Sequence, residues 1–149
     1  MPRSPSQRAA LAGSPDDVEA AFYDALQAGD VERLMACWAD EDEILCVHPG
    51  GARLLGPAAI RAAFTAMFER GGLGVRPMQV VRMQALASAV HSVEEHIRVM
   101  LPDGPREALV LATNVYHKTP QGWRLVAHHA SPGGQREAGA PEPVRHMLH

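Results

Sequence analysis

Glu95 and His128 are the two side chains best suited by type and setting to acid–base chemistry. Each lies in a β-rich, largely apolar run, Glu95 within residues 88–101 and His128 within residues 123–130. Burial raises the pKa of a carboxylic acid toward neutral pH, and histidine already titrates there. Such a pair can act as general acid and base, an effect typically worth about a hundred- to ten-thousand-fold in rate. The competing interpretation is structural: the two side chains hydrogen-bond to each other in the core.

Three further polar side chains are candidates for orienting a bound molecule. Thr113 and Asn114 are neighbours in the strand-like run 107–117, and His48 precedes a Pro-Gly-Gly turn. We interpret His48 either as a proton carrier at the mouth of a pocket or as a strand-end histidine that hydrogen-bonds the backbone of that turn.

Three aromatic residues of the predicted helices complete the candidate ligand-binding set. They are Tyr23, Trp38 and Phe64. Ligand pockets are mostly apolar with a few placed polar groups, so these rings could form the wall and lid of a pocket. The alternative is that they belong to the hydrophobic core.

No metal site and no cofactor are predicted. A ligand set could be drawn from His48, His96, His128 and His129, but adjacent residues of a strand point to opposite faces, which separates the last two. The chain contains neither an HExxH motif nor paired CxxC motifs.

The composition predicts a single globular domain in the cytoplasm. The 149 residues are 46% hydrophobic and 21% charged, and the net charge of −3 offers no basic surface for nucleic acid. No apolar run is long enough for a membrane span, and the start of the chain lacks the apolar stretch of a signal peptide. Cys37 and Cys46 are expected to be free thiols in a reducing cytosol. A hydrolase acting through Cys46 is a remote alternative, since no basic neighbour is evident to lower the pKa of its thiol.

Three helices are predicted in the first half of the chain. Residues 14–15 supply a serine cap and a proline suited to the first helical position, and Gly29 ends that helix. Asp30 can cap a short second helix. Residues 57–70 form the third. The first and third helices have apolar residues at i, i+3, i+4, i+7 and i+8: Val18, Ala21, Phe22, Ala25 and Leu26, then Ile60, Ala63, Phe64, Met67 and Phe68.

The second half predicts an antiparallel meander. The expected strands are residues 44–48, 78–84, 88–101, 107–117 and 123–130. Residues 107–132 form a long hairpin, and because two strands alone are not stable, this hairpin must be the spine of a larger sheet. We predict a flexible arm over residues 1–13, a domain over 14–132 and a tail over 133–149.

Simple hairpin loops at 102–106 and 119–122 assign the strand residues to two faces. The more apolar face, expected beneath the helices, carries Glu95, Ile97, Val99, Leu109, Leu111, Thr113, Val115, Val126 and His128. The opposite face carries Glu94, His96, Arg98, Ala112, Asn114, Tyr116, Leu125 and His129. A bulge would exchange parts of these sets. The second face needs a cover, and a homodimer through the sheet is the simplest one.

Three stretches resemble the SnoaL-like branch of the NTF2-like superfamily, which includes ketosteroid isomerase and scytalone dehydratase. They are FYDALQAGDVERLMACWADEDEILCVHPGG, LLGPAAIRAAFTAMF and LATNVYHKTPQGWRLVAHHASP. The resemblance covers residues 15–132. It implies an α+β, cone-shaped half-barrel with helices packed on a curved sheet, a small-molecule pocket and dimerisation through the sheet. The catalytic residues of ketosteroid isomerase have no residue-by-residue match here; the strands offer Glu94 or Glu95, His96, Asn114 and His128 instead.

The leading hypothesis is a homodimer whose cone binds a small, largely apolar organic ligand. As an enzyme it would be a cofactor-free isomerase or dehydratase, with Glu95 and His128 as the acid–base pair. The alternative is a non-catalytic dimeric binding or association module.

Overall fold

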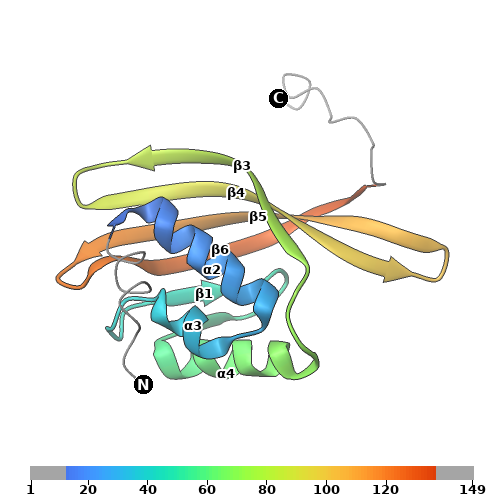
Figure 1. The fold of residues 1–149 in the computed structure, drawn as a ribbon, viewed down its shortest axis with the longest axis horizontal. Coiled ribbons are helices and arrows are strands. Elements are labelled where there is room, and N and C mark those ends of the chain that lie inside the picture. Colours follow the sequence, from blue (N-terminus) through green and yellow to red (C-terminus); the bar gives the residue numbers. More distant parts are fainter. Residues whose placement is uncertain (1–12, 137–149) are drawn as a thin grey trace.

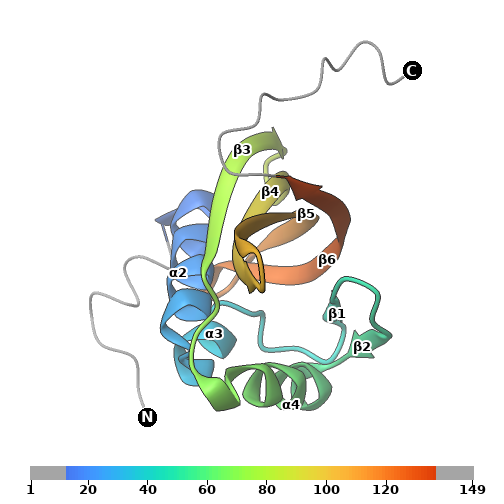
Figure 2. The same cartoon turned by 90° about the vertical axis from the view of Figure 1, so that its right-hand side faces the viewer.

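Helices α2 (Pro15–Ala28), α3 (Val31–Ala36) and α4 (Pro57–Met67) pack against one side of a strongly curved sheet in the computed structural model (Figures 1 and 2). The structure describes residues 13–136. The predicted α+β cone is confirmed. Most of the predicted arm and tail, residues 1–12 and 137–149, lies outside the described residues.

The helix ends follow local chemistry. The Ser14 side chain accepts a hydrogen bond from the backbone N–H of Asp17 (3.1 Å), and Asp30 caps α3 in the same way through Arg33. A short 3-10 helix, η1 (Phe68–Arg70), extends α4. Gly72 then passes so close to α2 that an added Cβ would lie 1.9 Å from the carbonyl oxygen of Gln27. Glycine is required there by the approach of two backbones.

Six strands form one sheet in the order β2-β1-β6-β5-β4-β3. Among the strands of residues 13–136, β1 and β6 are the only parallel neighbours. The bounds are β1 Leu45–Val47, β2 Arg53–Leu55, β3 Val75–Gln84, β4 Ser88–Leu101, β5 Gly104–Thr119 and β6 Gly122–Arg136. Strand β2 was not predicted, and β6 continues four residues into the predicted tail.

The register of β4 and β5 corrects the predicted faces. Leu101 pairs with Gly104, so the loop has two residues and Glu95 lies opposite Val110. The prediction had placed Glu95 with Leu109 and Leu111, one residue out of register. Because side chains alternate along a strand, that slip exchanged the two faces of β5. The β5 side chains that face the helices are Ala108, Val110, Ala112, Asn114 and Tyr116.

His128 was nevertheless predicted on the correct face, because a bulge in β6 shifts the strand by one residue and cancels the one-residue slip in β5. Val115 pairs with Ala127 but Tyr116 pairs with Leu125, which leaves Val126 as the extra residue. Leu125 and His128 therefore both point toward the helices, although an ordinary strand would direct them to opposite faces.

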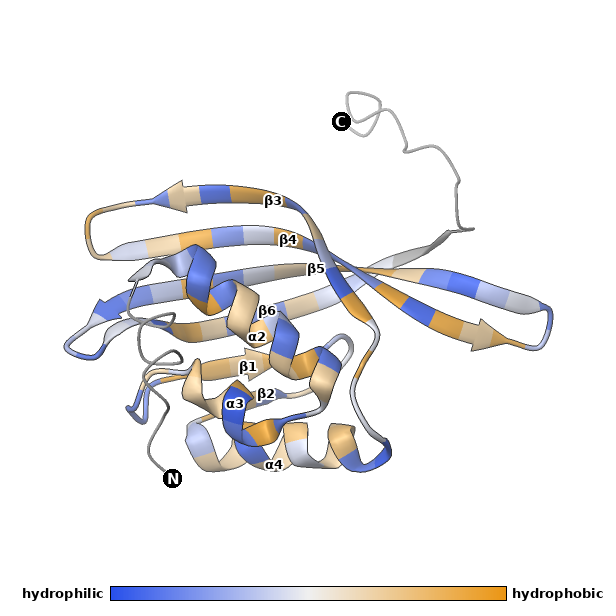
Figure 3. Cartoon of the chain, viewed as in Figure 1, coloured by the Kyte–Doolittle hydropathy of each residue, from blue (hydrophilic) through white to orange (hydrophobic). Residues whose placement is uncertain are grey.

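The outer sheet face is turned away from the helices. Hydrophilic and hydrophobic residues alternate along β3 to β5 (Figure 3). The pairing brings several apolar residues onto the outer sheet face: Met78, Val81, Met83, Val90, Leu111 and Val115. Leu111 is 48% exposed and Val81 51%. Within residues 13–136, no helix has the length and apolar character of a membrane span.

Candidate functional site

A cavity of ≈ 70 Å³ lies inside the cone, against the inner face of the sheet. Its walls are mostly apolar, with three titratable side chains among them. The lining residues are Leu26, His48, Pro49, Phe64, Met67, Leu73, Val75, Glu95, Ile97, His128 and Ala130. A larger groove of ≈ 590 Å³ runs past Gly72 and Arg98, but it is open to solvent. Charged groups at its edge already pair with one another, as Arg76 does with Glu107 at 3.0 Å. The inner cavity is therefore the better candidate for chemistry.

Glu95 and His128 meet at this cavity. Atom Nε2 of His128 lies 3.9 Å from Oε2 of Glu95, and both residues are buried. Strand β4 carries Glu95 and strand β6 carries His128, with β5 between them. His48, which follows β1, packs edge-on against Phe64 at a centroid distance of 5.0 Å and completes the polar part of the wall.

Asn114 fixes the protonation pattern of the site. Its amide nitrogen donates to Oη of Tyr23 (3.1 Å), so the Tyr23 hydroxyl directs its own proton to Oε2 of Glu95 (2.7 Å). Its amide oxygen lies 2.5 Å from Nδ1 of His128. An amide oxygen only accepts, so Nδ1 of His128 carries the proton and Nε2 is left as an acceptor beside Glu95.

Burial shifts the pKa values of Glu95 and His128 in opposite directions. Burial raises the pKa of Glu95 to about 7, with a smaller opposing effect from the Tyr23 hydrogen bond. Burial also lowers the pKa of His128 to about 3, assisted by His48 and His129. His128 is therefore neutral at physiological pH, and Glu95 can exchange a proton near pH 7. Burial lowers the pKa of His48 as well, in the direction of a neutral ring.

A second buried cluster continues the network away from the cavity. Oε2 of Glu19 accepts hydrogen bonds from Tyr116 (2.6 Å), His91 (2.8 Å) and Asn114 (3.3 Å). Burial, and then the Glu19 carboxylate, raise the pKa of the Tyr116 hydroxyl well above its ordinary value. Asn114 is the link between this cluster and Glu95.

Residues 16–134 match the model of the SnoaL-like domain family. The chain belongs to this family. No curated protein sequence matches the chain. Solved structures with the NTF2-like and cystatin-like fold resemble it, and they confirm the superfamily predicted from the sequence.

Three solved structures illustrate the range of this SnoaL-like domain's relatives. A proposed calcium/calmodulin-dependent protein kinase type II association domain from Thiobacillus denitrificans is 36% identical, with a TM-score of 0.73 over 81% of this chain and 96% of its own. A proposed NTF2-like dehydratase from Streptomyces avermitilis is 26% identical (TM-score 0.69, 87% and 98%). A cystatin-like protein from Caulobacter vibrioides is 18% identical (0.67, 78% and 85%) and shows the fold alone.

The SnoaL-like domain brings together some of the predicted site residues and separates others. Glu95, His128, His48 and Phe64 line one cavity. Tyr23 and Asn114 lie directly behind it as hydrogen-bond partners of Glu95 and His128. Two predicted ligand-binding residues lie elsewhere, Thr113 and Trp38.

Thr113 and Trp38 are the corrections to the predicted site. Thr113 pairs with Ser92 and is exposed on the outer sheet face. The prediction placed it in the cavity because its register was one residue out. Trp38 is buried beyond the end of α3 and borders a different hollow of ≈ 280 Å³. It pairs with Leu125 in an isolated parallel bridge, which fixes it away from the cavity.

Sequence reasoning missed Glu19, His91 and Tyr116 as a buried unit. Glu19 and Tyr23 are four residues apart on α2, so they share one helix face. His91 and Glu95 share the inner face of β4 because they are separated by an even number of residues. The sequence signal that could have revealed this unit was the carboxylate of Glu19, which lies beside the apolar stripe of α2.

Proposed function

We propose that this SnoaL-like domain binds a small, largely apolar carbonyl compound in the cone and moves one of its protons through Glu95 without a cofactor. The supporting observation is a carboxyl group whose pKa is raised to about 7 by burial, facing an apolar cavity beside a neutral imidazole. A general base works best when its pKa lies near the working pH.

Glu95 serves as base and then as acid in this scheme. The carboxylate takes a proton from the carbon next to the carbonyl group, and the resulting acid returns the proton to another carbon or to the oxygen of the enolate. The Tyr23 hydroxyl holds the carboxylate in place by its 2.7 Å hydrogen bond. Nε2 of the neutral His128 accepts a hydrogen bond from a hydroxyl group of the ligand.

The size of the cavity restricts the ligand. Sites for drug-sized molecules measure roughly 300–1,000 Å³, whereas this one measures ≈ 70 Å³. The bound molecule must be small, unless Met67 and Leu73 at the rim move aside. Met67 is 36% exposed, and methionine adapts easily to a changed neighbour.

Exchange of α-protons in D₂O tests the proposal without knowledge of the natural substrate. Small cyclic ketones and enones are incubated with the protein, and the loss of their α-proton signals is followed by ¹H NMR. We expect the wild type to accelerate exchange and Glu95→Gln to abolish the acceleration. Ala130→Leu should block the cavity, while Thr113→Val on the outer sheet face should retain activity. Equal exchange by the wild type and by Glu95→Gln would refute the role of Glu95.

A second function is favoured by the outer sheet face. Its apolar residues are exposed in the single chain, and the 36%-identical relative is named as an association domain. We propose that two copies of the chain associate through this face, which leaves both cavities inside their own cones. Dimerisation is compatible with ligand binding, and it is the whole function in the non-catalytic alternative.

A further inference from the structure

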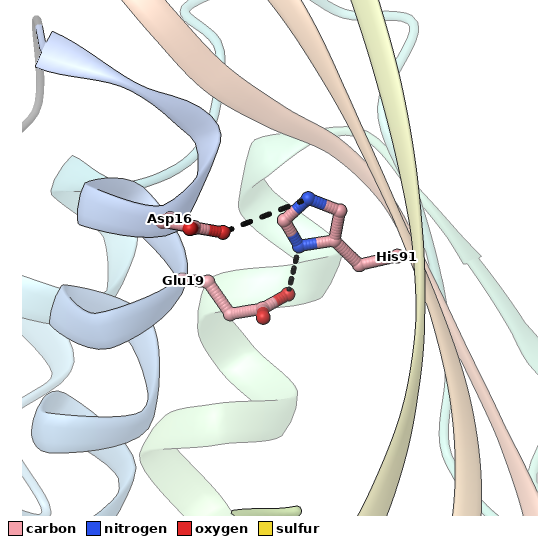
Figure 4. A group of neighbouring side chains, drawn as sticks. All are labelled: Asp16, Glu19 and His91. Atoms are coloured by element: carbon pink, nitrogen blue, oxygen red, sulfur yellow. Dashed lines mark hydrogen bonds and ion pairs between the residues drawn. The ribbon is translucent and has the colours of Figure 1, made fainter. Parts of the chain in front are cut away.

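His91 is completely buried, yet one of its ring nitrogens lacks a hydrogen-bond partner. The residue is 0% exposed, and Nε2 makes no hydrogen bond with any described side chain or backbone group. A buried polar nitrogen without a partner is costly and calls for an explanation. The ring lies between helix α2 and strand β4, with Asp16 on one side and Glu19 on the other (Figure 4).

Glu19 determines which nitrogen of His91 carries the proton. Its carboxylate accepts from Nδ1 at 2.8 Å, so Nδ1 is the N–H donor and Nε2 is the nitrogen that can bind a metal ion. The same carboxylate oxygen accepts from Tyr116 and Asn114, which holds it in place. A carboxylate that fixes the ring of a metal-binding histidine in this way is the usual arrangement in metalloproteins.

Atom Nε2 of His91 faces a second carboxylate. Oδ1 of Asp16 lies 3.9 Å from Nε2 of His91, too far for a hydrogen bond. Ligand atoms at about 2.0–2.2 Å from one tetrahedral ion lie roughly 3.3–3.6 Å apart. The Asp16 side chain is 56% exposed on the first turn of α2, so it can move the few tenths of an ångström that the difference requires.

We propose that Asp16 and His91 bind one divalent transition-metal ion, with Glu19 as the hydrogen-bonded support of the imidazole. One ligand atom from each of the three residues lies within 4.8 Å of the others. Imidazole nitrogen with carboxylate oxygen suits Zn²⁺, Co²⁺ and Ni²⁺ better than Ca²⁺ or Mg²⁺, which take oxygen ligands. Water molecules complete the coordination from the exposed side of Asp16. The site is separate from the proposed function of the cone cavity and does not depend on it.

Arg82 competes with the ion for Asp16. Its Nε donates to Oδ1 of Asp16 at 2.8 Å. The carboxylate has two oxygens, so it can serve both, but the guanidinium charge weakens binding of a cation. Removing this charge should therefore tighten the metal site, an effect that a purely structural His91 would not produce.

Titration of the purified full-length chain with Zn²⁺, followed by calorimetry and by thermal unfolding, tests the site. We expect one bound ion per chain and a rise in melting temperature. Asp16→Asn should weaken the affinity at least tenfold, and Arg82→Gln should strengthen it severalfold. Asp17→Asn, one residue along the same exposed turn, is the matched control and should bind like the wild type.

Co²⁺ absorption and ¹⁵N spectra of the histidine rings identify the ligands. The proposal expects a shift of the Nε2 resonance of His91 on addition of Zn²⁺. His91→Gln tests the same ligand, and Asp16→Asn keeps the test valid where that variant does not fold. Absence of binding at millimolar Zn²⁺, or binding that Asp16→Asn leaves unchanged, would overturn the site and assign any bound metal to histidines elsewhere in the chain.

Discussion

The side-chain oxygen of Asn114 lies 2.5 Å from Nδ1 of His128, while its nitrogen donates to Tyr23 and Glu19. One amide thus satisfies groups from a helix and from the neighbouring strand. No other uncharged side chain both accepts from an imidazole and donates to two oxygens except glutamine, which is one methylene longer.

Asn114→Asp should be strongly destabilising. The new carboxylate still accepts from His128, but it can no longer donate to Tyr23 or Glu19 and it places a second charge beside Glu19. Buried groups left without partners cost about 1–3 kcal/mol each, so we expect a loss of roughly 2–4 kcal/mol in urea unfolding. Thr65→Asp, at an exposed position of α4 away from the sheet, should change the free energy by less than about 1 kcal/mol. Similar losses in both variants would contradict the network.

Glu95→Gln should change the pH dependence of stability between about pH 4.5 and 7. The folded-state pKa of Glu95 is raised from its ordinary 4.5 to about 7, so the folded state retains a proton that the unfolded state has released. The stabilisation of the folded state by this proton is complete below pH 4.5 and is lost as the pH rises through 7. The loss in the free energy of unfolding is on the order of 3 kcal/mol in total. Glutamine does not titrate, so the variant should lack this decrease in unfolding experiments at several pH values. An unchanged decrease would show that Glu95 titrates normally.

His128→Gln should have the opposite effect on the acid side. The folded-state pKa of His128 is lowered from 6.5 to about 3, so the unfolded state binds a proton that the folded state refuses. Stability from this group is complete above pH 6.5 and is lost toward pH 3, by up to about 1.4 kcal/mol per pH unit. Chemical unfolding of the variant should show a shallower loss in acid than the wild type. A loss in acid as steep as that of the wild type would contradict the lowered pKa of His128.

Leu111→Lys should separate a dimer that forms through the outer sheet face. Leu111 is 48% exposed near the middle of the sheet, and a buried unpaired ammonium group at an interface is costly. Size-exclusion chromatography with light scattering should show the mass of two chains for the wild type and of one chain for the variant. Leu86→Lys, at a turn residue that is 94% exposed, should remain dimeric. A wild type with the mass of one chain would refute the proposed dimer.

The fold could be predicted from local signals because those signals agree with one another. Ser14, Gly29 and Asp30 mark helix ends by capping chemistry that depends only on neighbouring residues. The apolar spacing on α2 and α4 matches the faces that the structure buries, including Phe22 and Phe64. The long strands likewise occupy the predicted parts of the chain. The short strand β2 was missed because Leu54 is its one partly buried residue, which leaves no alternating apolar pattern.

The site could be predicted only in part because it depends on strand register. Glu95 and His128 were identified by type and context, and the structure places them 3.9 Å apart. Asn114 and Thr113 are adjacent, so a single residue of slip decides which of them faces inward. The loop at Pro102-Asp103 and the bulge at Val126 set that register. Asp16, Glu19 and His91 escaped notice as a group because more than seventy positions of sequence separate the strand histidine from the helix.

The three hydrogen bonds that converge on Glu19 also bear on how this chain can change during evolution. A variant that loses the Glu19 carboxylate leaves three buried donors, on Tyr116, His91 and Asn114, without this acceptor. Any single substitution at position 19 therefore lowers the stability of the fold. Substitutions at these positions should therefore be inherited together. Homologues in which position 19 is apolar should carry phenylalanine in place of Tyr116 and a non-donor in place of His91. Homologues with only one of these substitutions should be rare.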